Sequence, residues 1–126
     1  MNNILKELRL FYSAVHKIWD CYQASGPGKV DSRMYPAVEV SAERFLVLLA
    51  ERDKTQTEQH DLIAETEGQS LRAAVVTASR LAKRCACDAA GLSFVTGEAG
   101  LIPRRDLIDE FLRSLQIIER ACQKTS

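Results

Sequence analysis

The stretch NILKELRLFYSAVHKIWDCYQA (3–24) carries the clearest structural pattern in the chain. Large apolar residues recur there at alternating steps of four and three, which is the repeat of one face of an α-helix. A second apolar set at heptad spacing widens this face. The main positions are Ile4, Leu8, Phe11, Val15, Ile18 and Tyr22, and the widening positions are Leu5, Tyr12 and Trp19. We therefore expect a helix over 3–24 with a broad buried face, ended by the Gly-Pro-Gly sequence at 26–28.

The remainder of the chain predicts three further helices. Ser41 suits the N-cap position before the apolar run AERFLVLLA (42–50), which gives a helix over 41–67. The next helix, over 69–96, is rich in alanine, and its small side chains favour a central place where neighbouring helices approach closely. Gly97 is the expected C-terminal cap of that helix. Pro103 then opens a helix over 103–124, because proline is favoured in a first helical turn.

The polar stretch ERDKTQTEQHD (51–61) leaves two alternatives open. The second helix continues through it to residue 67, or it ends near Lys54 and a new helix begins at a capping box formed by Thr55 and Glu58. No Gly, Pro or Asn occurs between residues 41 and 67, which favours the continuous helix.

Four helices with short connections predict an all-α protein, an antiparallel up-and-down four-helix bundle in a single domain over 1–126. Apolar residues make up 46% and charged residues 27% of the 126 residues, values typical of a folded domain. We expect a cytoplasmic protein, because no signal peptide or membrane-spanning run is visible. In that compartment Cys21, Cys85, Cys87 and Cys122 should stay reduced.

Metal, cofactor and catalytic signals are weak. Cys85 and Cys87 lie two positions apart, about 200° round a helix, so they cannot bind one ion unless the helix breaks there. No CxxC pair is present, and neither His16 nor His60 has a nucleophile at a spacing that forces a catalytic pair. We expect no metal and no cofactor, and we favour a protein that is not an enzyme.

A basic cluster at the junction of the third and fourth helices is the candidate anion-binding site. It consists of Arg80, Lys83, Arg84, Arg104 and Arg105. The helix dipole disfavours arginine in a first helical turn. The presence of Arg104 and Arg105 there is therefore explained if an anion binds at that helix start. Alternatively, Asp106, Asp109 and Glu110 neutralise the arginines within the same helix. The net charge of zero makes a general nucleic-acid binder a less favoured class.

Surplus apolar residues suggest an interaction face. Its candidate residues are Tyr12, Trp19, Tyr22, Met34 and Tyr35. We expect a small bundle to leave some of these side chains uncovered, and uncovered faces promote association with a second copy or another protein. The alternative is that the loops fold over the end of the bundle and cover them.

Three functions follow from the sequence. The favoured one is a non-enzymatic interaction or accessory protein that self-associates or binds a protein partner, away from membranes. The second is binding of nucleic acid or a phosphate ligand through the basic cluster. The third is a small-molecule site inside the bundle, lined by aromatic residues of the first helix and small residues of the third.

Overall fold

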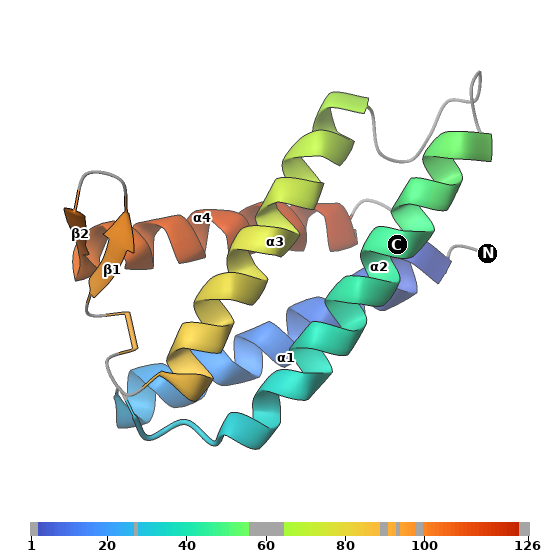
Figure 1. Cartoon of the computed structure of the whole chain (residues 1–126). Coiled ribbons are helices and arrows are strands. Elements are labelled where there is room, and N and C mark those ends of the chain that lie inside the picture. Colours follow the sequence, from blue (N-terminus) through green and yellow to red (C-terminus); the bar gives the residue numbers. More distant parts are fainter. Residues whose placement is uncertain are drawn as a thin grey trace.

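The computed structural model describes the backbone of residues 3–26, 28–55, 65–88, 91–92, 94–97 and 100–123. These residues form four α-helices, α1 (Asn3–Ser25), α2 (Tyr35–Thr55), α3 (Glu65–Cys87) and α4 (Arg104–Gln123), with a 3-10 turn at Ser32–Met34 and a hairpin of β1 (Phe94–Gly97) and β2 (Gly100–Pro103). Successive helices run in opposite directions (Figure 1). The predicted all-α antiparallel four-helix bundle is therefore confirmed.

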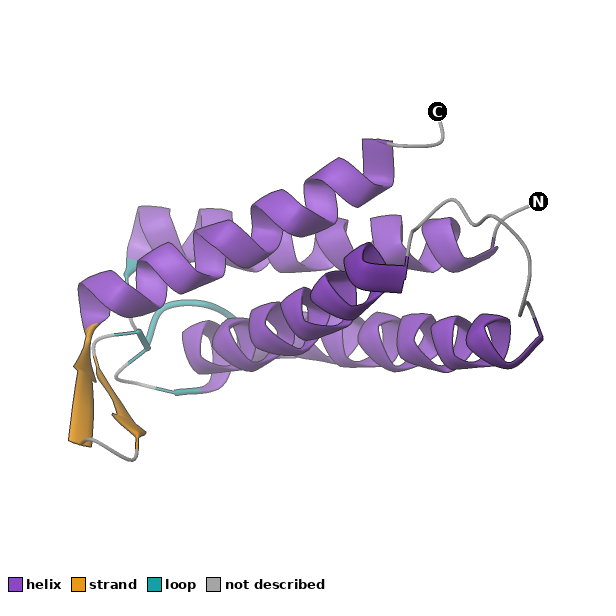
Figure 2. Cartoon of the chain, turned by 90° about the horizontal axis from the view of Figure 1, so that it is seen from above, coloured by secondary structure: helices purple, strands orange, loops and turns teal. Residues whose placement is uncertain are grey.

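The helices differ in how many neighbours they contact. Helices α1 and α3 each pack against the other three, whereas α2 packs chiefly against α1 and α3. Helix α4 crosses α3 steeply, and the hairpin stands at the end of the bundle where α4 begins (Figures 1 and 2). The outer side of α2 consequently lies at the edge of the bundle.

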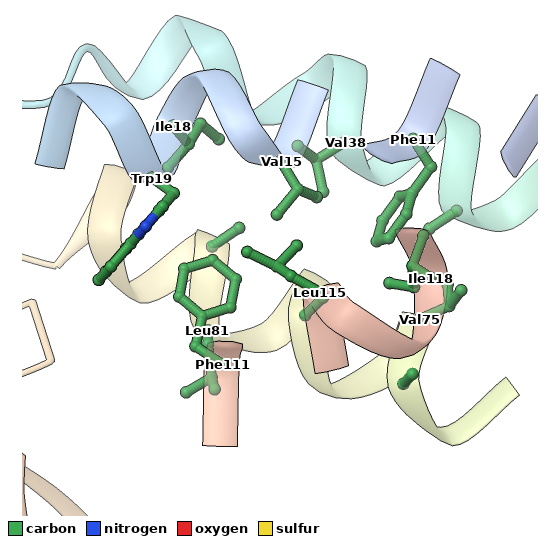
Figure 3. Close-up of a cluster of buried hydrophobic side chains, with 14 of the residues drawn as sticks. Phe11, Val15, Ile18, Trp19, Val38, Val75, Leu81, Phe111, Leu115 and Ile118 are labelled. Atoms are coloured by element: carbon green, nitrogen blue, oxygen red, sulfur yellow. The ribbon is translucent and has the colours of Figure 1, made fainter. Parts of the chain in front are cut away.

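The core is built from large side chains of all four helices, which point toward one another (Figure 3). Phe11 of α1, Phe45 of α2, Leu81 of α3 and Phe111 of α4 are fully buried. The ring of Trp19 meets the ring of Phe111 edge-on, with centroids 5.3 Å apart. Burial of each such side chain contributes about 1.5–3 kcal/mol, which makes this cluster the main source of stability.

Helix α1 confirms the prediction for residues 3–24 to within one residue. The helix ends where the amide of Gly26 donates a hydrogen bond to the carbonyl of Tyr22 at 2.8 Å. Gly26 has φ +87°, a left-handed conformation that glycine adopts without steric cost. The glycine thus ends the helix through its backbone conformation.

Helix α2 begins at Tyr35, so the predicted start at Ser41 is wrong. The Ser41 hydroxyl donates to the carbonyl of Ala37 at 2.7 Å, which satisfies the side chain inside the helix instead of at its cap. Pro36 occupies the first turn, where its missing N–H costs nothing. Helix α2 ends at Thr55 and a separate helix begins at Glu65, so residues 65–67 belong to α3. Residues 56–64, with most of the polar stretch, lie outside the described residues.

Helix α3 ends at Cys87, so the predicted extension to residue 96 is wrong. Gly91 has φ +59° and its amide donates to the carbonyl of Asp88 at 2.9 Å, forming a turn. Leu92 is buried as its spacing indicates, but it reaches the core from this turn. Gly97, the expected helix cap, pairs with Gly100 in the hairpin. Pro103 is the last residue of β2, immediately before α4.

Candidate functional site

The predicted anion site contains two arginines that already have acidic partners. Arg80 Nη2 lies 3.6 Å from Glu110 Oε1, which links α3 to α4. Arg84 Nη1 lies 3.4 Å from Asp88 Oδ2, and Arg84 Nε donates to the carbonyl of Gly91 at 3.0 Å. Both arginines therefore hold the chain's own elements together.

The other members of this cluster are Lys83, Arg104 and Arg105. Lys83 and Arg105 are exposed, and neither forms an ion pair with a described residue. The side chain of Arg104 lies outside the described residues. Glu110, which the alternative paired with an arginine of its own helix, lies instead beside Arg80 of α3.

The predicted aromatic interaction face is corrected by the structure. Trp19 and Tyr22 are buried, and Tyr12, Met34 and Tyr35 are partly buried against the core. The wide apolar face of α1 is needed because α1 contacts three other helices. Trp19 and Tyr22 therefore belong to the core, and Tyr12, Met34 and Tyr35 are only partly exposed.

The hydroxyl groups of two of these tyrosines connect distant parts of the chain. The buried Tyr22 hydroxyl accepts a hydrogen bond from the Leu92 amide at 3.0 Å, joining α1 to the turn after α3. The Tyr35 hydroxyl lies 3.3 Å from Ser79 Oγ, joining α2 to α3. The Tyr22 and Tyr35 hydroxyls therefore link elements that lie far apart in the sequence.

The described cysteine and histidine side chains do not form a metal-binding group. Cys85 is buried and Cys87 is exposed, which confirms that they face opposite sides of α3. Burial raises the pKa of the Cys85 thiol to about 12, so this side chain is not a thiolate at neutral pH. His16 Nδ1 lies 3.1 Å from Asp20 Oδ2 on the surface of α1, and His60 lies outside the described residues. Among the described residues, no group of three or more His, Cys, Asp and Glu side chains could hold a metal ion.

The outer side of α2 carries exposed apolar residues that the aromatic prediction did not include. Val40 is 45% exposed and Val47 is 53% exposed. Each follows a fully buried residue by two positions, Val38 and Phe45, and residues two apart point about 200° apart on a helix. Both valines therefore point away from the core and are about half exposed.

A shallow groove of about 490 Å³ runs along this surface. Its lining is mostly apolar, and the residues that form it are Glu7, Val40, Glu43, Arg44, Val47 and Leu48. One oxygen of the Glu7 carboxylate, Oε1, is buried and has no hydrogen-bond partner. Neither Glu43 nor Arg44 forms an ion pair with another described residue. The groove thus combines apolar walls with charged groups that have no partner within the described chain.

The sequence contained a signal for this surface that the misplaced helix start obscured. If α2 began at residue 41, Val40 would lie in a loop, and its seven-residue spacing to Val47 would not place the two valines on one helix face. With the helix starting at Tyr35, the two valines share one face. Helix α2 is also the least amphipathic of the four helices, because apolar residues occur on both of its sides.

Comparisons of the chain with protein-family models, with curated proteins and with solved structures give no significant match. No helix in the described part of the chain combines the length and the apolar content that crossing a membrane requires.

Proposed function

We propose that this chain acts by association, as a non-enzymatic helical-bundle protein that binds a second copy of itself, and that it does so in the cytoplasm. The observation that carries the proposal is the groove beside α2 and Glu7 of α1, where Val40 and Val47 are about half exposed. Exposed apolar side chains that share one helix face and one groove favour association with a partner.

The position of these valines distinguishes them from scattered surface hydrophobic residues. Single exposed apolar side chains are ordinary on soluble proteins. Here two of them share one face of one helix and one groove, and the charged groups beside them have no partner among the described residues. A partner that covers this surface would bury the apolar side chains and must also supply groups of opposite charge, because burial of an unpaired charge is costly.

The two other functions receive less support. In the basic cluster, Arg80 and Arg84 already pair with Glu110 and Asp88, which reduces the charge available to a phosphate. Between the helices, the region considered for a small molecule is occupied by Phe11, Phe45 and Phe111. A cytoplasmic setting agrees with four free cysteines, because a reducing compartment keeps thiols unpaired.

The test is the mass of the chain in solution, measured by light scattering over protein concentrations up to about 1 mM, the range in which weak interfaces associate. The measurement is made at low and at high salt, because salt screens ion pairs but not apolar contacts. We expect the mass to rise with concentration from 14.1 kDa toward twice that value at both salt levels. A mass that stays at 14.1 kDa at every concentration would overturn the proposal.

A further inference from the structure

We draw no further inference here: the strongest candidate, the buried Glu7 carboxylate oxygen in the groove beside α2, which has no hydrogen-bond partner among the described residues, belongs to the site already described, and nothing in the structure shows which group covers it.

Discussion

The hydrogen bond between Tyr22 and Leu92 gives a sharp test of how the turn after α3 is held. Substitution of Tyr22 by Phe removes one oxygen from a side chain that is buried, and it leaves the Leu92 amide without the acceptor that lies 3.0 Å away. A buried donor without a partner costs about 1–3 kcal/mol. We therefore expect Y22F to lower the free energy of unfolding by about 1–3 kcal/mol.

The assay is equilibrium unfolding in urea, followed by the fluorescence of Trp19, the single tryptophan. Protein concentration is held equal in all samples, since association adds to apparent stability. The midpoint should fall while the urea dependence of the unfolding free energy stays the same. The control is Y35F, whose hydroxyl makes a longer, partly exposed contact of 3.3 Å, and we expect it to cost less than about 1 kcal/mol. A Y22F variant within about 0.5 kcal/mol of the wild type would refute the account of this turn.

Two further predictions concern the core. F111A removes a fully buried ring that meets Trp19 edge-on, so we expect it to lower the free energy of unfolding by about 3–5 kcal/mol in the same urea assay. The control L112A changes a residue that is 37% exposed and should cost less than about 1 kcal/mol. Equal losses in the two variants would contradict the assigned core face of α4. Burial raises the pKa of Cys85 from 9.0 to about 12, so the folded chain keeps this thiol protonated at pH values where the unfolded chain ionises it. Stability is therefore lost as pH rises through 9 toward 12, and between pH 8 and 10 the wild type should lose about 1 kcal/mol more than C85A. If the wild type and C85A lose the same free energy of unfolding between the two pH values, the thiol is not buried in the folded chain.

The bundle could be predicted from sequence because apolar periodicity reports burial directly. The face of α1 and the burial of Leu92 both follow from spacing. Spacing does not report the backbone conformation that delivers a side chain to the core, so Leu92 was assigned to a helix although it reaches the core from a turn at Gly91. The hairpin over 94–103 was missed for the same reason.

The candidate sites could be predicted less well, because they depend on which surfaces the helices cover. The basic residues were found, but the pairing of Arg80 with Glu110 depends on how α3 packs on α4. The aromatic residues of α1 were expected to be in excess, and the number of helices that α1 contacts explains why they are not. The outer side of α2 required the correct helix start at Tyr35, and the sequence alone does not show that the Ser41 hydroxyl bonds to Ala37 inside the helix instead of capping it.

The most direct test of the account is the solution mass of V47D beside that of V76D. The two valines are 53% and 51% exposed, on α2 and α3 respectively, so the substitutions are matched in chemistry and exposure. At a concentration where the wild type approaches twice 14.1 kDa, V47D should remain at 14.1 kDa and V76D should match the wild type. A V47D variant that associates as the wild type does would contradict the assignment of the interface to α2.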